Sequence, residues 1–215
     1  MVRLVVFDLD GTLVDSARDI AAAVNAALAA LEPGTAPLAL ERVVGFVGDG
    51  ARRLIERVLQ HRGSSLRPDR VLPLYLEAYR ERLLDTTRLY AGVSEALAEL
   101  AASGRPLAVL TNKPGDLSRT ILNGLGVGSR FARIWGAGDV PARKPDPAGL
   151  RALLAELGAA TEEVWLVGDS PTDVETARAA GVRAAGVAWG FDVNGLRAAA
   201  PDRFLDNPRE LVLLA

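Results

Sequence analysis

The sequence predicts an α/β protein with a doubly wound parallel sheet and an inserted α-helical cap. Three observations carry this prediction: an apolar run near the start ends in two acids, strand-like and helical patterns alternate after residue 90, and residues 15–88 have helical periodicity alone. Strands that alternate with helices favour a parallel sheet with right-handed crossovers. We therefore expect a Rossmann-like core from residues 1–14 and 89–215, and a helical cap from residues 15–88.

The first strand is expected at about residues 3–9, and it leads into Asp8-Leu9-Asp10-Gly11-Thr12. Side chains two residues apart point to the same side of a strand, so the two carboxylates lie together. Each carboxylate disfavours ionisation of the other, and a divalent cation is the usual means of offsetting that repulsion. The pattern predicts a metal-assisted carboxylate site within the first dozen residues.

The helices of the cap follow from apolar spacing and from their end signals. Asp15-Ser16 offers a cap to a helix that Pro33-Gly34 stops, a glycine-rich turn precedes a helix over 51–60, and Pro68 opens a longer helix through Leu84. We expect the stripe on this last helix to pack inside the cap; it consists of Leu72, Leu76, Tyr79 and Leu83. No strand is expected between residues 15 and 88.

The remainder of the core alternates between helix and strand. Proline just inside helix starts and glycine just past helix ends mark the boundaries. Helices are expected near 93–103, 115–124, 147–157 and 171–180, and strands near 106–111, 132–136, 164–168, 184–188 and 204–205.

The composition excludes several classes of protein and of binding partner. The 215 residues suit one large domain or a core with an insert, and 25 Lys+Arg against 27 Asp+Glu give no electrostatic basis for binding nucleic acid or an acidic membrane surface. The absence of Cys excludes disulfides, thiolate nucleophiles and Cys-ligated zinc. With no signal-peptide pattern and no apolar stretch of roughly 20 residues, we expect a soluble cytoplasmic protein, a monomer or a homodimer.

Chemistry-bearing side chains gather at the strand ends, where doubly wound sheets bind their ligands. They are Asp8, Asp10, Thr111, Asn112, Lys144, Asp169 and Asp173. This set suits phosphoryl transfer, which depends on positioning and charge stabilisation. Magnesium would hold the carboxylates and one phosphate oxygen, Lys144 would bind another oxygen, and Thr111 and backbone N–H groups near Gly11 would bind the rest. One carboxylate can attack phosphorus, and another can serve as acid and then base.

These residues resemble the four motifs of the haloacid dehalogenase superfamily, in the family's order. Asp8-Leu9-Asp10-Gly11-Thr12 matches the first motif, Thr111 the second, Lys144 the third, and the stretch from Gly168 to Asp173 the fourth. The resemblance implies that Asp8 is the nucleophile and Asp10 the acid/base. It also implies magnesium held by Asp8, the backbone carbonyl of Asp10 and Asp169, with Asp173 in support.

Within the superfamily, several stretches resemble phosphoglycolate phosphatases. These are residues 8–20, 47–51, 110–114 and 186–191. Ala91 stands where that pattern has Pro, and Pro171-Thr172 replaces a commoner polar pair, so the substrate within the class of small phosphorylated metabolites stays open.

Other roles are open for several residues. Asp173 could cap the following helix. The turn Gly48-Asp49-Gly50 could be a mere helix start, or its N–H groups could bind a substrate carboxylate, with Arg52 and Arg53 assisting. We expect a surface role for Lys113, and a surface or helix-end role for His61.

The residues bear on four rival functions. Asp10 argues against a haloacid dehalogenase, which does not need a second aspartate, and the absence of lysine from 15–88 excludes a Schiff-base phosphonate hydrolase. A phosphosugar mutase also uses both aspartates and is the nearest rival. A non-catalytic regulator that binds a metabolite would show a damaged site, and the core positions are intact.

Overall fold

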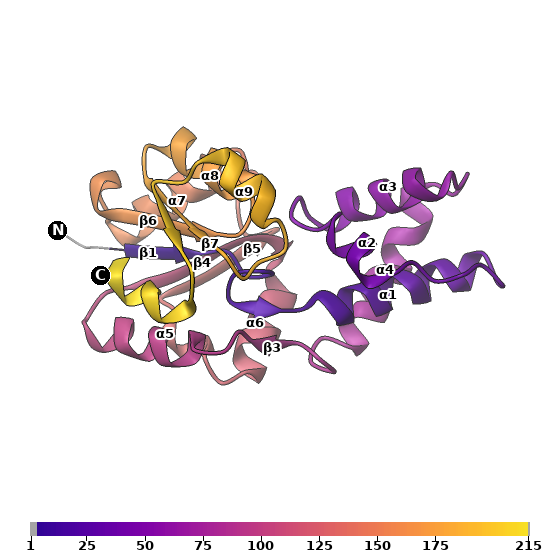
Figure 1. The fold of residues 1–215 in the computed structure, drawn as a ribbon, viewed down its shortest axis with the longest axis horizontal. Coiled ribbons are helices and arrows are strands. Elements are labelled where there is room, and N and C mark those ends of the chain that lie inside the picture. The colour runs from indigo at the N-terminus through magenta and orange to yellow at the C-terminus, as the bar shows by residue number, and fades with distance from the viewer. Residues whose placement is uncertain (1–3, 215) are drawn as a thin grey trace.

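The computed structural model describes residues 4–214 and contains a six-stranded, fully parallel sheet (Figure 1). The strand order is β5-β4-β1-β6-β7-β8. From the central β1 the chain moves outward through β4 and β5, then crosses back to β6 and continues to β7 and β8. The strands are β1 (Leu4–Phe7), β4 (Leu107–Pro114), β5 (Arg133–Ala137), β6 (Val164–Gly168), β7 (Arg183–Val187) and β8 (Arg203–Leu205).

Helices cover both faces of this sheet, as a strand buried on both sides requires. Along β1, Val5 and Phe7 join one apolar cluster, while Leu4 and Val6 join a second cluster on the other face. The first face packs against α5 (Val93–Ala102), α6 (Gly115–Gly124) and the 3₁₀ segment Pro208–Leu214, and the second against α7 (Ala148–Leu157), α8 (Pro171–Ala180) and α9 (Val193–Ala199).

The cap, by which we mean helices α1 to α4, lies beyond one end of the sheet (Figure 1). Its helices are α1 (Ala17–Leu31), α2 (Leu40–Val44), α3 (Ala51–Arg62) and α4 (Pro68–Glu81). Two crossing segments connect it to the core, and they pair as a short antiparallel ribbon of β2 (Val14–Asp15) and β3 (Arg88–Leu89). None of the described helices combines the length and apolar character needed to cross a bilayer.

The sequence predicted most of these elements. The doubly wound parallel sheet is confirmed, although residue 3, the predicted start of the first strand, lies outside the described residues. The prediction of no strand in 15–88 was wrong at its two ends, because the crossing segments lie close enough to pair. The helix from Pro68 ends at Glu81 rather than Leu84, and the short helices α2 and α9 were not predicted.

A buried aspartate ties the cap to the returning chain. Asp19 lies in the first turn of α1 and is 2% exposed. Its carboxylate accepts hydrogen bonds from the backbone N–H of Thr87 at 2.8 Å, the Thr87 hydroxyl at 2.7 Å, and the N–H and hydroxyl of Thr86. Burial alone would raise the pKa of Asp19, but these donors prevail and lower it.

Asp19→Asn is expected to lower the free energy of unfolding by about 2–4 kcal/mol, because the amide replaces one acceptor with a donor that faces donors. The lowered pKa of Asp19 means that its stabilising contribution is present above the carboxyl's ordinary pKa and is lost as pH falls through the folded value. Urea unfolding at neutral and acidic pH measures both effects. Asp85→Asn, an exposed change one residue before Thr86, is the control. Equal stability of the two variants would contradict the anchoring role.

Candidate active site

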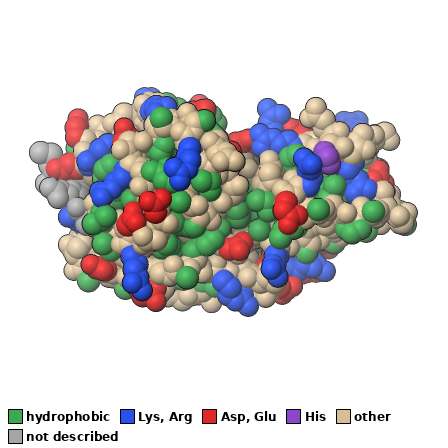
Figure 2. All heavy atoms as spheres, in the orientation of Figure 1, with side chains coloured by type: hydrophobic (Ala, Val, Ile, Leu, Met, Phe, Trp, Pro, Cys, Tyr) green, Lys and Arg blue, Asp and Glu red, His purple; other side chains and the backbone are tan. Residues whose placement is uncertain are grey.

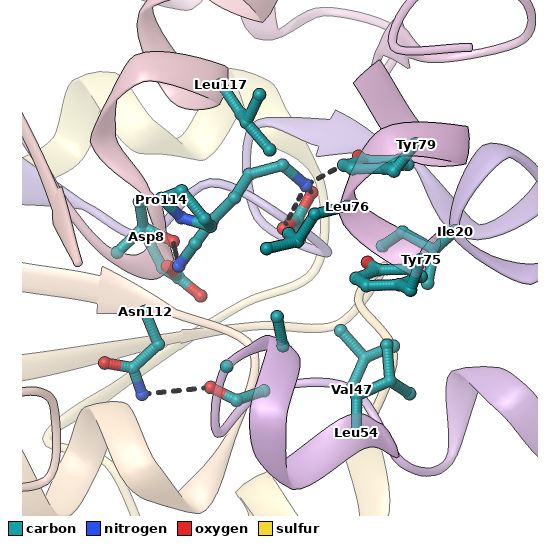
Figure 3. A pocket seen from close by; sticks show the side chains of 16 residues that line it. Asp8, Ile20, Val47, Leu54, Tyr75, Leu76, Tyr79, Asn112, Pro114 and Leu117 are labelled. Carbon is teal, nitrogen blue, oxygen red and sulfur yellow. Dashed lines mark hydrogen bonds and ion pairs between the residues drawn. The ribbon is translucent and has the colours of Figure 1, made fainter. Parts of the chain in front are cut away.

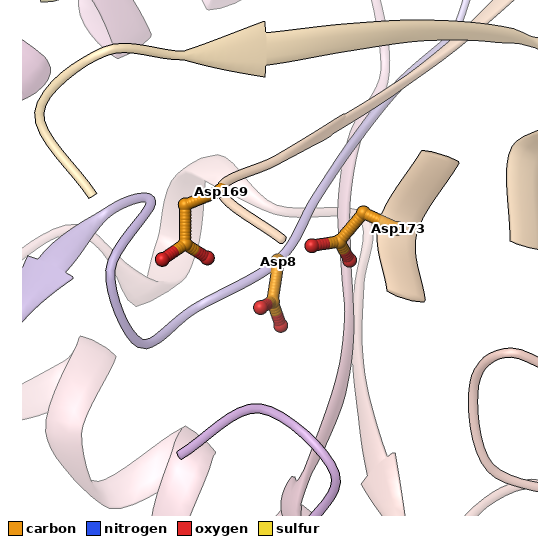
Figure 4. A group of neighbouring side chains, drawn as sticks. All are labelled: Asp8, Asp169 and Asp173. Carbon is orange, nitrogen blue, oxygen red and sulfur yellow. The ribbon is translucent and has the colours of Figure 1, made fainter. Parts of the chain in front are cut away.

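Three buried carboxylates meet at the carboxyl ends of β1 and β6 (Figure 4). Asp8 follows β1, Asp169 follows β6, and Asp173 lies in the first turn of α8. One oxygen from each lies within 4.8 Å of the others. Parallel neighbouring strands end at one edge, so β1–β6 pairing brings together residues that are distant in sequence.

Lys144 partly neutralises this cluster. Its ammonium lies 2.5 Å from Asp173 Oδ1 and 2.9 Å from Asp8 Oδ1, with only 3% of its side chain exposed. Burial opposes the charge on Lys144, but Asp173 and Asp8 outweigh it and raise the pKa of the amine. Burial raises the pKa of Asp8 to about 6; Lys144 opposes this rise and Asp173 adds to it.

Asp169 lies against backbone on two sides. It accepts a hydrogen bond from the Phe191 N–H at 2.7 Å and one from the Thr12 hydroxyl at 3.4 Å. Gly11 has φ +81°, and a Cβ there would lie 2.1 Å from an Asp169 oxygen; a Cβ at Gly190 would be equally close to Asp169 Cβ. The two glycines allow the carboxylate to pack between the loops. Burial, together with Asp8 and Asp173, raises the pKa of Asp169 well above its ordinary value.

The donor set fits a hard divalent cation. Asp8 Oδ1 is buried and makes no hydrogen bond of good geometry, although Lys144 lies within ion-pair distance. The cluster has three buried carboxylates and one buried ammonium, that of Lys144, which leaves a formal excess of two negative charges. Carboxylate oxygens are the ligands that Mg²⁺ prefers. A divalent cation would balance this charge.

Asp173 caps α8 and also lies in the acid cluster, while its predicted support of a metal stays a prediction. Its Oδ2 accepts from the Ser170 N–H and hydroxyl, which forms a capping box at the start of α8. Its Oδ1 accepts from Lys144 and belongs to the acid cluster. The helix cap thus fixes the orientation of a site carboxylate.

The Asp10 carboxylate turns away from the acid cluster. It accepts hydrogen bonds from the Ser16 hydroxyl and from the Lys113 ammonium, at 2.8 Å and 2.7 Å for its two oxygens. Of the pair Asp15-Ser16 predicted to cap α1, Asp15 accepts a hydrogen bond from the Ala17 N–H at 3.2 Å, whereas the Ser16 hydroxyl donates to Asp10 and makes no cap hydrogen bond among the described residues. Among the described carboxylates, the cluster contains Asp8, Asp169 and Asp173 without the Asp10 side chain. A metal contact from the Asp10 backbone carbonyl stays a prediction.

The surface role expected for Lys113 was wrong. β4 continues to Pro114 instead of ending at Thr111, so Lys113 lies on a buried strand and its side chain is 5% exposed. Its ammonium also contacts the Tyr79 hydroxyl of α4 at 2.6 Å. This residue pairs with the predicted acid/base across 103 positions in sequence.

Thr111 and Asn112 lie within β4, which continues to Pro114, and they line the pocket that Asp8 also lines. The Asn112 amide donates to the carbonyl oxygens of Lys144 at 2.9 Å and of Gly48 at 3.1 Å. Its Oδ1 is buried and has no hydrogen-bond partner among residues 4–214. Thr172 donates to Asp49 at 2.9 Å. The turn Gly48-Asp49-Gly50 thus contacts the core at two points.

Asp8 lines a pocket between cap and core (Figure 3). Asp10 lines the same pocket. Its cap wall includes Gly48, Gly50 and Ala51 at the start of α3, together with Tyr75 and Tyr79 of α4. Tyr79 and Leu83 are buried, as the stripe predicted. Tyr79 and Leu76 also face the pocket, which spacing alone could not show.

Three basic residues of α3 do not line this pocket: His61, Arg52 and Arg53. His61 is exposed in the last turn of α3 beside Phe46, which confirms the surface or helix-end prediction. Arg52 and Arg53 pair with Asp69 and Glu56 and line a separate cleft. On the face that Figure 2 shows, basic and acidic side chains are interspersed.

Comparisons with known proteins agree with this geometry. A family model described as haloacid dehalogenase-like hydrolase matches residues 5–187. Phosphoglycolate phosphatase 1 of Pseudomonas aeruginosa is 38% identical over 216 residues, which cover 98% of this chain and 78% of the relative. A phosphoglycolate phosphatase of Cereibacter sphaeroides is 47% identical over 185 residues, which cover 83% and 82%.

A solved structure shares the whole fold. The crystal structure of a predicted phosphoglycolate phosphatase from Haemophilus somnus matches with a TM-score of 0.92 at 30% identity, and covers 99% of this chain and 97% of that one. Residues 5–187, which the family model matches, contain the acid cluster, Lys144 and the whole cap. The chain belongs to the haloacid dehalogenase-like hydrolase family.

Proposed function

We propose that this hydrolase is a magnesium-dependent phosphatase of small phosphomonoesters, with 2-phosphoglycolate as substrate. The observation that carries the proposal is the arrangement at the pocket: Asp8 and Asp10 both line it, and Asp8 also belongs to a carboxylate cluster paired with Lys144. The names of the relatives support the substrate. Cytoplasmic location and a monomeric or dimeric state stay predictions.

Asp8 is the proposed nucleophile. An oxygen of its carboxylate attacks phosphorus, the ester P–O bond breaks, and an aspartyl-phosphate forms. Among the described residues Asp8 Oδ1 accepts no hydrogen bond of good geometry, which supports this role. Lys144, 2.9 Å away, would hold the phosphoryl group and limit the build-up of negative charge.

Asp10 is the proposed acid and base. It gives a proton to the departing ester oxygen and then takes one from the water that attacks the aspartyl-phosphate, which releases inorganic phosphate and restores Asp8. Its contacts with Ser16 and Lys113 hold the carboxylate at the pocket wall. Thr111 and backbone N–H groups near Gly11 are the proposed phosphate ligands. Asn112, predicted in the same role, would have to release the Gly48 or the Lys144 carbonyl oxygen before its amide could donate to a phosphate.

Asp8, Asp169 and Asp173, with the Asp10 backbone carbonyl, are the residues that would hold magnesium. The bound ion would neutralise charge on a phosphate oxygen and on the carboxylates. We propose residues 15–88 as the cap domain that excludes water from the phosphorylated site. The turn Gly48-Asp49-Gly50, beside the first N–H groups of α3, is proposed to contact the substrate, and its two glycines line the pocket.

A panel of phosphate esters, assayed for released phosphate with Mg²⁺ and with EDTA, tests this function. Phosphoglycolate should rank near the top, and EDTA should abolish release. A phosphosugar mutase would instead convert a sugar phosphate into its isomer, which product analysis by NMR would detect. Isomerisation without phosphate release would overturn the phosphatase proposal.

Magnesium is expected to raise the melting temperature more at about pH 7.5 than at about pH 5. Burial raises the pKa of Asp8 to about 6 and that of Asp169 well above its ordinary value. A carboxyl with a raised folded pKa favours folding at low pH, and this contribution is lost as pH rises through the folded value. The metal-free protein therefore loses stability toward neutral pH, where the ion restores it.

Thermal unfolding by circular dichroism, in EDTA and in saturating Mg²⁺, measures this difference. A magnesium concentration about 100-fold above Kd corresponds to roughly 2.7 kcal/mol, which shifts Tm by several degrees. Asp169→Asn should lose most of the shift, whereas the exposed Asp206→Asn should keep it. If Mg²⁺ raised Tm equally at pH 5 and pH 7.5, the proposed binding of the ion by the buried carboxylates would be contradicted.

A further inference from the structure

Lys113 is a buried cation whose part in the steps described above is limited to holding Asp10. Its ammonium contacts both oxygens of Asp10 and the Tyr79 hydroxyl at 2.6 Å, and its side chain is 5% exposed. A buried ammonium is costly unless it is paired. The residue lines the same pocket as Asp8, so it lies beside the place where a substrate must bind.

A second polar group beside Lys113 has no partner. Tyr75 is 4% exposed and lines the pocket, and its hydroxyl has no hydrogen bond within the part of the chain that the structure describes. Its ring stacks on Tyr79 with centroids 5.7 Å apart (Figure 3). Because Tyr75 lines the pocket, a ligand bound there would supply a partner for its hydroxyl.

The rest of the pocket is largely apolar and small. Its side walls are formed by Ile20, Val47, Leu54, Leu76 and Leu117. The cavity measures about 40 Å³ with the cap in this position, which is room for a few water molecules. Such walls offer few partners to the hydroxyls of a sugar ring, whereas one ammonium and two tyrosine hydroxyls suit a single small anionic group.

Asp10 is the sole carboxylate within ion-pair distance of Lys113 among residues 4–214. When the ester oxygen of a substrate approaches Asp10, that carboxylate must share its contacts with the leaving group. Lys113 can then bind a second anion without leaving its place, provided that the anion lies close to the ester oxygen.

We propose that Lys113, with the hydroxyls of Tyr75 and Tyr79, binds a carboxylate one carbon from the ester oxygen and so selects phosphorylated 2-hydroxy acids over neutral esters. This inference rests on the proposed phosphatase function and names the part of the substrate that these side chains contact. Lys113 is thereby a specificity-determining residue, in addition to its contact with Asp10.

A matched pair of esters tests the proposal. 2-Phosphoglycolate and 2-hydroxyethyl phosphate share the same two-carbon skeleton and differ in whether a carboxylate or a CH₂OH group ends it. The wild-type enzyme with Mg²⁺ should prefer phosphoglycolate in kcat/KM. In Lys113→Met this preference should fall by about 10- to 150-fold, the value of a charge-assisted hydrogen bond, mainly through KM for phosphoglycolate.

The ratio of kcat/KM for the two esters distinguishes recognition of the carboxylate by Lys113 from positioning of Asp10. Loss of the Asp10 contact lowers turnover of both esters by a common factor, which cancels in the ratio. Lys113→Arg keeps the charge and should restore part of the preference, although its planar group is not equivalent to an ammonium. Tyr75→Phe, which removes one hydroxyl from the pocket, should lower the preference by a smaller factor.

A measurement on the wild-type protein keeps the test decisive if Lys113→Met fails to fold. Glycolate should then inhibit phosphoglycolate hydrolysis competitively at a concentration at least about 10-fold below that of ethylene glycol. An unchanged ester ratio in a folded Lys113→Met, or equal inhibition by the two alcohols, overturns the role of Lys113 and leaves the phosphatase proposal standing. Absence of phosphate release from either ester by the wild-type enzyme overturns the phosphatase proposal itself.

Discussion

Asp8→Asn is expected to lower kcat for phosphate release by at least about 10⁴-fold, because an amide is a poor nucleophile and the proposed covalent step depends on the carboxylate. The replacement keeps the shape of the side chain. It also removes one buried negative charge from a cluster in which burial raises the pKa of Asp8 to about 6. The variant should therefore fold at least as stably as the wild type when metal is absent.

Rapid quenching of the reaction with ³²P-labelled ester distinguishes this role from a merely structural one. The wild-type enzyme should retain label on a peptide that contains residue 8, and Asp8→Asn should retain none. Asp206→Asn, at an exposed aspartate in the loop after β8, is the matched control and should turn over normally. Substantial turnover by Asp8→Asn would refute the aspartyl-phosphate mechanism.

The sequence predicted where the site lies because strand ends are strong signals. Asp8, Thr111 and Asp169 each follow an apolar run, and parallel strands end at one edge of the sheet. Lys144 was predicted from its place in the motif order, and the structure places its ammonium between Asp8 and Asp173. Local pattern and chain order were sufficient for these four residues.

Lys113 could not be placed in the same way. Its burial depends on β4 continuing beyond Thr111, and its contact with Tyr79 joins residues 34 positions apart from two different parts of the fold. A buried strand that extends into a polar stretch leaves no apolar signal to mark its length. The nearest sequence signal was scarcity, since Lys113 and Lys144 are the two lysines of the chain.

The missed elements are short or depend on tertiary contacts. Helices α2 and α9 have five and seven residues, too few for a clear helical period. The ribbon of β2 and β3 has two residues in each strand, and it forms because both crossing segments leave the core side by side. In each case packing against the rest of the molecule decides the local structure.

Lys144→Met is expected to lower kcat by about 10²–10³-fold, the usual effect of removing a charged group that stabilises a phosphoryl transition state. Methionine preserves most of the volume of the side chain but not its charge. Asp173 and Asp8 outweigh burial and raise the pKa of Lys144, so the amine is charged at neutral pH. The loss should therefore be the same at pH 6 and pH 8.

The same variant tests how the acid cluster is balanced. Without the ammonium, Asp8, Asp169 and Asp173 have no buried cation between them, and the metal-free protein should lose about 3–5 kcal/mol of stability. Saturating Mg²⁺ should recover much of this stability but not the turnover, because the ion balances the carboxylates and cannot supply the ammonium's hydrogen bonds to the phosphoryl group. Arg67→Met, at a side chain 81% exposed, should change neither quantity. If Mg²⁺ restored the activity of Lys144→Met together with its stability, Lys144 would serve only to balance the acids, and its proposed role as a phosphate ligand would be wrong.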